Sequence, residues 1–177
     1  MEEYFPPFSD DFISKVAKFA EENPRREYNE NYSMEELPGS LGTLLKQNKL
    51  ASAQIAYLDG KFQFFMASRI AEDTGMYLVC VRLFSSLENV KKPIHTAFSL
   101  RLQMEHGKKL GFSECSMTMN VGVRDRLAEL VKKRYLKYPH TPNSIKAVAL
   151  ENLSKFEYIG VRVINYCEQH VFTAKLT

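Results

Sequence analysis

The chain offers few side chains of the kinds that form metal centres or nucleophilic sites. Its three cysteines, Cys80, Cys115 and Cys167, show no C-x-x-C spacing, and its four histidines show no H-x-x-x-H or comparable metal spacing. Two of the cysteines, Cys80 and Cys115, lie in apolar segments typical of strands, where cysteine usually behaves as a small core residue. We therefore expect buried free thiols and no bound metal.

A cluster of basic side chains could bind phosphate groups. Residues 123–138 are predicted to form a helix with apolar residues on one side and arginines and lysines on its other faces. Such a surface could follow the phosphates of a nucleic acid or contact an acidic partner. Asp125 and Glu129 lie among the basic residues, as they would on a solvated helix surface, so both interpretations stay open. The basic side chains are Arg124, Arg126, Lys132, Lys133, Arg134 and Lys137.

Length and composition are those of a globular protein of one domain. The 177 residues can bury a substantial core, and the hydrophobic fraction of 45% is ordinary for such proteins. No apolar run approaches the roughly 18 residues that span a membrane. The acidic N-terminus lacks the basic start and apolar centre of a signal peptide. We expect a single domain over residues 1–177, located in the cytoplasm and with no membrane partner.

Two helices are predicted near the N-terminus. Residues 9–22 place apolar side chains on one helical face, and Ser9 or Asp10 can cap the start. Residues 40–47 are predicted to form a shorter helix, interrupted upstream by a proline and a glycine. Its inward residues are expected to be Leu41, Leu44 and Leu45.

Three strands are predicted to follow. Residues 51–58 and 61–70 flank Asp59-Gly60, which is the strongest short hairpin signal a sequence offers. Residues 76–84 are nearly continuously apolar and rich in β-forming types, as expected of a central strand covered on both faces.

A helix and another strand are predicted next. Residues 96–106 indicate a helix that Gly107 ends, and residues 113–120 alternate as a half-buried strand does. The helix is expected to pack through Phe98, Leu100, Leu102 and Met104.

The last third of the chain runs from a helix into a two-stranded ribbon. Residues 143–155 have a helical pattern, and residues 156–166 and 171–176 have strand patterns. This segment resembles the N-x-x-x-A-x-x-L-Y-x-x-x-G-F segment of the GNAT N-acetyltransferases. The residues at comparable places are Asn143, Ala147, Leu150 and Phe156.

The order of predicted elements over about residues 8–177 is also similar to that of the GNAT family. The resemblance implies an α/β (α+β) fold, in which a central mixed and mostly antiparallel sheet is flanked by helices. Compared with a minimal GNAT domain, the basic helix at about residues 121–140 looks like an insertion.

The resemblance implies a binding site for the pyrophosphate of acetyl-CoA, with no metal. In the family, the central strand ends in a loop of the form R/Q-x-x-G-x-G/A, whose N–H groups and following helix hold the anion. The equivalent residues are 91–97, where His95 replaces the first glycine. His95 could assist a phosphate or act as a polar cap with no ligand. The implied cofactor-binding residues are Val81, Leu83, Lys92, Ile94, His95, Thr96, Ala97 and Asn143.

The resemblance also implies direct acetyl transfer. An acceptor amine attacks the thioester, backbone beyond a splay in the central strand polarises its carbonyl, and a tyrosine often protonates the departing thiolate. That tyrosine would fall near Glu151, so Tyr138 or Tyr135 on the preceding helix would have to substitute, unless they are core residues. Glu72, beside Asp73 between two strands, is the candidate general base, or else half of an exposed acidic pair in a turn.

Three functions remain open at this stage. The first is a GNAT-like acyltransferase that moves an acetyl group from acetyl-CoA to an amine on a small molecule or a protein. The second is an inactive GNAT-shaped binding or assembly protein that engages an acidic partner or nucleic acid through residues 124–137. The missing glycine and tyrosine favour it. The third is a nucleic-acid-binding or nucleic-acid-modifying protein, but no zinc-knuckle or helix-turn-helix signal supports it. We favour the first.

Overall fold

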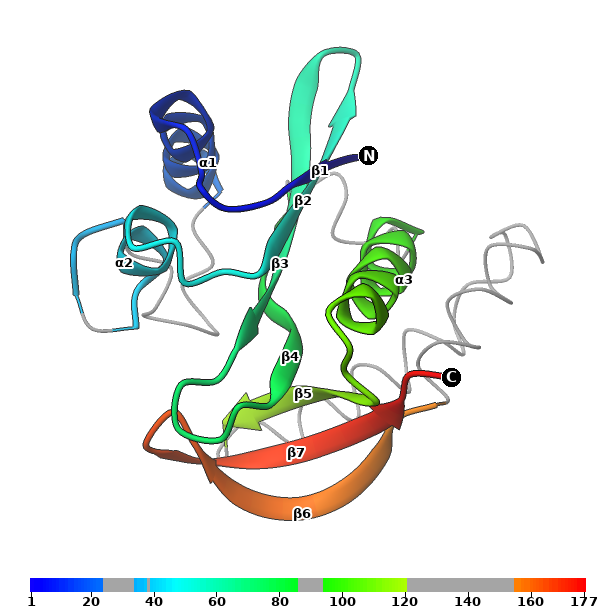
Figure 1. Ribbon diagram of the computed structural model, residues 1–177. Helices are drawn as coiled ribbons and strands as arrows, with labels where there is room; N and C mark the ends of the chain where they lie inside the picture. Colours follow the sequence, from blue (N-terminus) through cyan, green and yellow to red (C-terminus); the bar gives the residue numbers. More distant parts are fainter. Residues whose placement is uncertain (24–33, 38, 86–93, 121–154) are drawn as a thin grey trace.

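A computed structural model of the chain describes residues 1–23, 34–37, 39–85, 94–120 and 155–177 (Figure 1). These residues form a seven-stranded sheet in the order β1-β2-β3-β4-β5-β7-β6. Every neighbouring pair among them is antiparallel except β4 and β5, which run parallel. The strands are β1 Glu2–Tyr4, β2 Ser52–Leu58, β3 Lys61–Ile70, β4 Tyr77–Ser85, β5 Glu114–Asn120, β6 Glu157–Ile164 and β7 Cys167–Lys175; the helices are α1 Asp10–Glu22, α2 Leu41–Lys46 and α3 Ile94–Lys109. The predicted α/β (α+β) fold class is confirmed.

Helices α1 and α2 cover one face of the sheet. The Ser9 hydroxyl accepts the N–H of Phe12 at 3.2 Å and so caps α1, and Ser40 caps α2 in the same way. Both predicted helices are therefore confirmed. Their apolar sides form one core with Ile55 of β2 and Phe65 of β3, which are 0% exposed.

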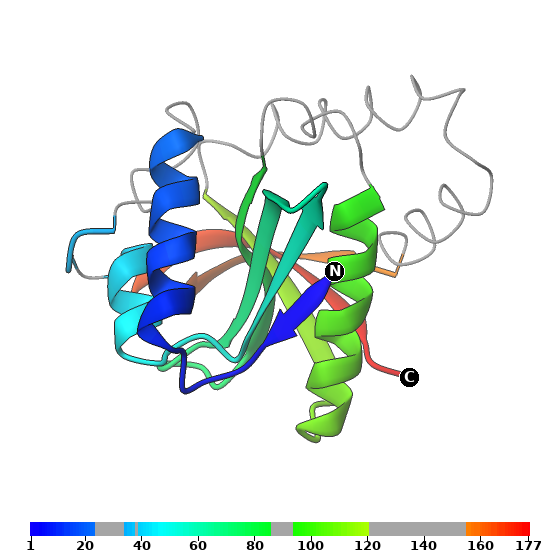
Figure 2. The same cartoon turned by 90° about the horizontal axis from the view of Figure 1, so that it is seen from above.

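Helix α3 covers the opposite face (Figure 2). Because side chains alternate along a strand, Phe64 and Met66 point away from α1 and α2 and pack in a second core with Leu100 and Met104 of α3. Figure 1 shows β5, β7 and β6 running across the foot of the first four strands, so the sheet turns strongly between β4 and β5.

Two details of α3 differ from the prediction. The helix does not end at Gly107 but continues to Lys109. Phe98 was expected to pack but is 42% exposed, and the small or polar residues Ser99 and Gln103 are buried instead. The reason is that the buried stripe runs through Leu100, Gln103 and Met104 at helical spacing, and Ser99 lies four residues before Gln103. Phe98 falls outside that stripe.

Strands β1 and β7 also differ from the prediction. Strand β1 was not predicted, because its pairing with β2 is a long-range contact that three residues cannot signal by themselves. Strand β7 begins at Cys167, earlier than expected, because a two-residue turn joins it to β6. In that turn Asn165 and Tyr166 both have positive φ, at 52° and 63°, as tight hairpins require.

Several predictions lie outside the described residues. They include the predicted helices over residues 123–138 and 143–155. They also include the predicted insertion at about residues 121–140. Within the described parts of the chain, no helix is long and apolar enough to cross a membrane.

Candidate functional site

The central feature of the sheet is the point where β4 leaves β5. Leu78 pairs with Ser116, and no other pair joins these two strands within the described residues. Just beyond Leu78, β4 contains a bulge: between the pairs Ala67–Arg82 and Arg69–Leu78, three residues of β4 face one residue of β3. A bulge bends its strand and increases the local twist. The two strands therefore diverge toward the C-terminal end of β4.

Cys80 lies at the centre of the bulge with φ = 56°, a left-handed conformation that costs a non-glycine residue roughly 1–2 kcal/mol. Its backbone N–H does not point into the sheet ladder but donates to Oε1 of Gln103 on α3, at 2.8 Å. The bulge is thus fixed by a side chain from the helix above it.

Helix α3 runs back along β4, so that its first turn lies at the C-terminal end of that strand. The His95 ring contacts the ring of Phe64 on β3 in a tilted arrangement, with centroids 5.6 Å apart. Phe64 pairs with Ser85, the last residue of β4. Further along the helix, Gln103 meets Cys80, and Gly107 lies against Tyr77. The positive end of the helix dipole is therefore next to the place where β4 and β5 have separated.

The first turn of α3 carries no acidic side chain, whereas its last turn has His106, Lys108 and Lys109. A carboxylate in the first turn would compete with an anionic ligand for the helix N-terminus, so its absence suits anion binding. The His95 ring contacts β3, which lies on the opposite side of β4 from β5.

Solved structures share this fold. No protein-family model matches the chain, and no curated protein sequence matches it. An acetyltransferase of the GNAT family from Streptococcus pneumoniae superposes with a TM-score of 0.53 at 7% identity, covering 99% of this chain and 100% of its own. The chain has the GNAT fold.

Two further GNAT-fold neighbours agree over nearly their whole lengths. An aminoglycoside 6'-N-acetyltransferase complexed with coenzyme A has a TM-score of 0.56 at 13% identity, with 100% of this chain and 98% of that chain covered. A chimera of the spermidine N-acetyltransferase SpeG from Vibrio cholerae and hSSAT has a TM-score of 0.55 at 11% identity, with 99% and 97% covered. At these identities the likeness establishes the fold alone.

Several predicted cofactor residues lie on β4 or in the first turn of α3. Val81 lies in the β4 bulge, and Thr96 and Ala97 lie in the first turn of α3, with Ala97 buried. Leu83 belongs to β4, Ile94 begins α3, and His95 has been placed above. Lys92, Asn143, Tyr135 and Tyr138 lie outside the described residues. The binding and catalytic roles of all these residues remain predictions.

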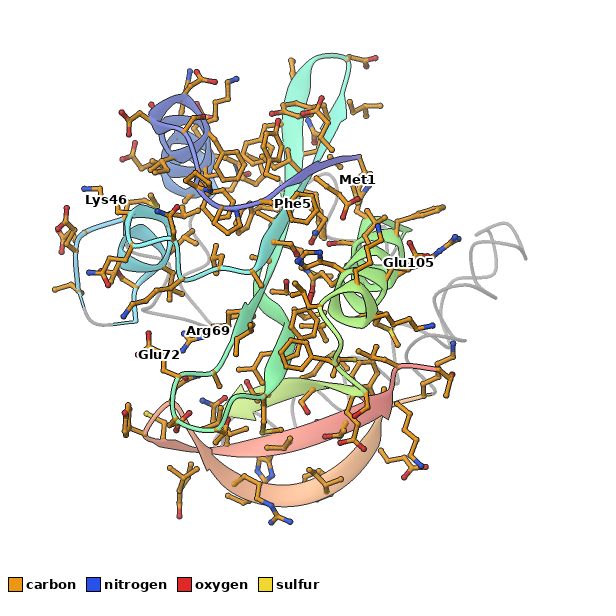
Figure 3. All side chains as sticks on the ribbon, in the orientation of Figure 1. Met1, Phe5, Lys46, Arg69, Glu72 and Glu105 are labelled. Atoms are coloured by element: carbon orange, nitrogen blue, oxygen red, sulfur yellow. The ribbon has the colours of Figure 1, made fainter. Side chains whose placement is uncertain are left out.

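Glu72, the predicted base, lies in the turn between β3 and β4. Its carboxylate forms an exposed ion pair with Lys49 at 2.8 Å, which lowers its pKa, and burial partly opposes that shift. The turn is at the opposite end of β4 from the first turn of α3, and Figure 3 shows Glu72 with Arg69 on the side of the molecule away from α3. Its role as base stays a prediction, and the lowered pKa weighs against it because a weaker base accepts a proton less readily.

The thiols match the prediction in part. All three cysteines are free; Cys115 is buried and Cys80 half-buried, but Cys167 is exposed. Burial raises the pKa of both the Cys80 and Cys115 thiols to about 12. They therefore stay protonated at neutral pH and are not nucleophiles.

The turn between β3 and β4 is tied to the turn between β6 and β7. The Asp73 carboxylate accepts the backbone N–H of Tyr166 at 3.2 Å and that of Asn165, and these bonds lower its pKa. Arg69 is 8% exposed, and its guanidinium donates to the side-chain oxygen of Asn165. Among the described residues, the Nε atom of Arg69 is a buried side-chain nitrogen without a hydrogen-bond partner. Glu72 and Asp73 supply negative charge near this buried guanidinium.

Replacing Asp73 by alanine is expected to lower the melting temperature at neutral pH but not in acid. Because the folded-state pKa is lowered, the carboxylate stabilises the fold above its unfolded-state value of about 3.9. That contribution is lost as the pH falls through the lowered folded-state value. Melting curves of both proteins should therefore converge below about pH 3. Glu168→Ala, at an exposed carboxylate on β7, is the control, and a pH-independent difference for Asp73→Ala would contradict the assignment.

The buried polar residues beside the bulge were not predicted from the sequence. Gln54 of β2, Ser99 and Gln103 of α3, and Tyr77 of β4 are between 0% and 1% exposed and bond to one another or to shared partners. A signal was present for Gln54, an uncharged amide in a segment that is otherwise mostly apolar, but not for Gln103, which lies between Arg101 and Glu105. Which partners they would find could not be read from the chain.

Proposed function

We propose that this protein is an N-acetyltransferase that transfers an acetyl group from acetyl-CoA to an amine. The observation that carries the proposal is the β4–β5 divergence beyond the pair Leu78–Ser116, with the first turn of α3 at its edge. Support also comes from the neighbours of the same fold, one of which is complexed with coenzyme A.

The described residues fit such a ligand. The first turn of α3 offers backbone N–H groups that no intrahelical carbonyl can satisfy, together with the positive end of the helix dipole. Ala97 has the smallest chiral side chain and is buried, so it does not extend into the space before the helix. We assign the pyrophosphate to this turn, and the pantetheine arm to the β4 backbone from Val81 to Leu83, in the opening.

When bound, acetyl-CoA supplies the thioester whose carbonyl carbon the acceptor nitrogen attacks, so that an N–C bond forms and the C–S bond breaks. The chain's part is to position and to polarise. Backbone N–H groups of β4 beyond the bulge would donate to the carbonyl oxygen as negative charge develops there. The acceptor nitrogen releases its proton to solvent, and the departing thiolate of coenzyme A takes up a proton from solvent, so neither transfer requires a described residue.

The acceptor is proposed to be a small amine. One neighbour is named an aminoglycoside 6'-N-acetyltransferase and another a spermidine N-acetyltransferase. Both names describe polyamine-like acceptors rich in primary amines. Kanamycin, spermidine and a lysine-containing peptide are therefore suitable probes of the acceptor class.

Adding coenzyme A or acetyl-CoA is expected to stabilise the protein. At about 100 times the dissociation constant, binding adds roughly 2.7 kcal/mol to the free energy of unfolding, which raises the melting temperature of a chain this size by roughly 5–10 °C. Thr96→Glu places a carboxylate at the first turn of α3, and repulsion of the pyrophosphate should reduce affinity at least about tenfold while the helix dipole favours the new charge.

Phe98→Glu is the matched control, since it adds the same charge to the same helix at a position that is 42% exposed. Its response to coenzyme A should equal that of the unmodified protein. No melting shift with millimolar coenzyme A or acetyl-CoA would refute the transferase proposal and favour the non-catalytic binding protein. Transfer itself is measured as thiol release with each of the three amines.

A further inference from the structure

A chain of buried polar side chains beside the bulge joins α3 to the strands β2, β3 and β4. Nε2 of Gln103 donates to Oε1 of Gln54 at 2.6 Å, and the Ser99 hydroxyl donates to the same oxygen at 3.1 Å. Nε2 of Gln54 donates to the Ser52 hydroxyl at 3.0 Å, which lies 2.7 Å from that of Ser68. Tyr77 closes the chain: its hydroxyl donates to the Gln103 carbonyl at 2.8 Å and lies 3.0 Å from the Ser68 hydroxyl.

One backbone group fixes the direction of this whole chain. The N–H of Cys80 can only donate, so the Gln103 atom that faces it must be oxygen. The Gln103 nitrogen is then turned toward Gln54, which must present its own oxygen and so turns its nitrogen to Ser52. Each amide therefore has one arrangement that satisfies its neighbours. Both Gln54 and Gln103 are 0% exposed, so water cannot replace a lost partner.

Burying so many polar side chains costs free energy, and a fully hydrogen-bonded network of this kind makes the local structure rigid. What it holds is the left-handed Cys80, a conformation that persists only where the surroundings determine it. Without the Gln103 acceptor, the Cys80 N–H would be left unsatisfied in the bulge, and β4 would gain by relaxing toward a regular ladder. The direction of β4 beyond Cys80 thus depends on Gln103.

We propose that Gln103 is a positioning residue for acetyl transfer: held by Gln54 and Ser99, it clamps the Cys80 amide and thereby aims the β4 backbone at the thioester carbonyl. This inference rests on the proposed function. Gln103 itself touches neither substrate. It acts through the bulge, and a shift of the bulge by about 1 Å would be enough to misplace the carbonyl-facing backbone.

Gln103→Leu removes the acceptor for Cys80 and the donor to Gln54. Hydrogen exchange of the Cys80 amide, followed by NMR, should become at least about tenfold faster, as expected when one net hydrogen bond is lost. Backbone N–H groups that face the thioester carbonyl should make the unmodified protein bind acetyl-CoA more tightly than coenzyme A. In Gln103→Leu the affinity for coenzyme A should stay unchanged, whereas this preference should disappear. With the fastest of the three probe amines, kcat should fall about 100-fold at unchanged KM.

Gln103→Glu provides a pH-dependent test that also serves if the leucine variant fails to fold. One carboxylate oxygen can still accept the Cys80 N–H, but the other faces the Gln54 oxygen. An ionised carboxylate is repelled by that oxygen, whereas a protonated one can donate a hydrogen bond to it. The ratio of the kcat of Gln103→Glu to that of the unmodified protein should therefore rise as the pH falls. If Gln103 only stabilised the fold, this ratio would not change with pH. Ser116→Ala is the control, since it removes a buried hydroxyl that is bonded to Thr173 of β7 at 2.9 Å and takes no part in the chain from Gln103 to Tyr77.

The outcomes separate the two proposals. If the unmodified protein binds neither coenzyme A nor acetyl-CoA, the proposed function fails, and with it the assigned role of Gln103. If the unmodified protein is active and Gln103→Leu loses protection of Cys80 yet keeps kcat and the acetyl-CoA preference, the positioning role is overturned and the proposed function stands. A flat pH ratio for Gln103→Glu would likewise overturn the positioning role.

Discussion

Gly107→Val is expected to lower the free energy of unfolding by about 3 kcal/mol, at the upper end of the usual cost of overpacking a core. A Cβ atom at Gly107 would lie 2.7 Å and 2.8 Å from two ring carbons of Tyr77 and 3.0 Å from Leu176. The Tyr77 ring cannot move aside, because it is 1% exposed, stacks on Phe112 with centroids 5.1 Å apart, and has its hydroxyl bonded twice.

Thermal or urea denaturation measures this effect, which corresponds to a fall in melting temperature of roughly 6–12 °C for a chain of this length. Lys109→Val is the matched control: it introduces the same side chain near the same end of α3 at an exposed position, where only the weaker helix propensity of valine and the loss of one charge at the helix C-terminus act. Equal losses for the two variants would show that the Tyr77 contact does not limit how closely α3 approaches β4.

Gly42→Ala is expected to have a similarly large effect on the other face of the sheet, again about 3 kcal/mol. A Cβ atom there would lie 2.2 Å from the backbone oxygen of Met34 and 2.6 Å from its carbonyl carbon. Both are main-chain atoms, so relief requires α2 or the segment before it to move. Because Leu41, Leu44 and Leu45 of α2 are buried in the core with α1, such a movement would loosen their packing.

Gly39→Ala distinguishes a steric cause from a conformational one. Gly39 has φ = 74° with no atom within 4 Å of an added Cβ, so alanine there should cost only the left-handed strain of roughly 1–2 kcal/mol. Chemical denaturation of the two variants gives both values. A loss at Gly42 no greater than that at Gly39 would contradict the close approach to Met34.

Gly107 and the amide network together explain how α3 is held. Gly107 lets the helix approach β4, and Gln103, one helical turn before it, then reaches the Cys80 amide. A larger residue at Gly107 would push the helix away and lengthen the bond between Gln103 and Cys80. Gly107→Val should therefore also weaken discrimination between acetyl-CoA and coenzyme A in whatever fraction of the protein remains folded.

The sequence by itself determined the elements whose causes are local. Asp59-Gly60 predicted the β2–β3 hairpin because both residues adopt positive φ, at 50° and 72°, in a tight turn. Ser9 predicted a helix start because a cap requires only a hydroxyl three residues before an N–H. The order of these elements, with the C-terminal helix–strand–strand pattern, was enough to indicate the GNAT fold.

Only the tertiary structure decided how the candidate site is built. Gln54 and Gln103 meet across 49 residues of sequence, and Cys80 takes a left-handed conformation that no local preference favours. Gly107 was expected to end a helix, but its actual role is set by Tyr77, which packs against it from another element. Local patterns fix a residue's own backbone, whereas the partner of a buried polar group depends on which elements pack together, and that is settled only when the whole sheet forms.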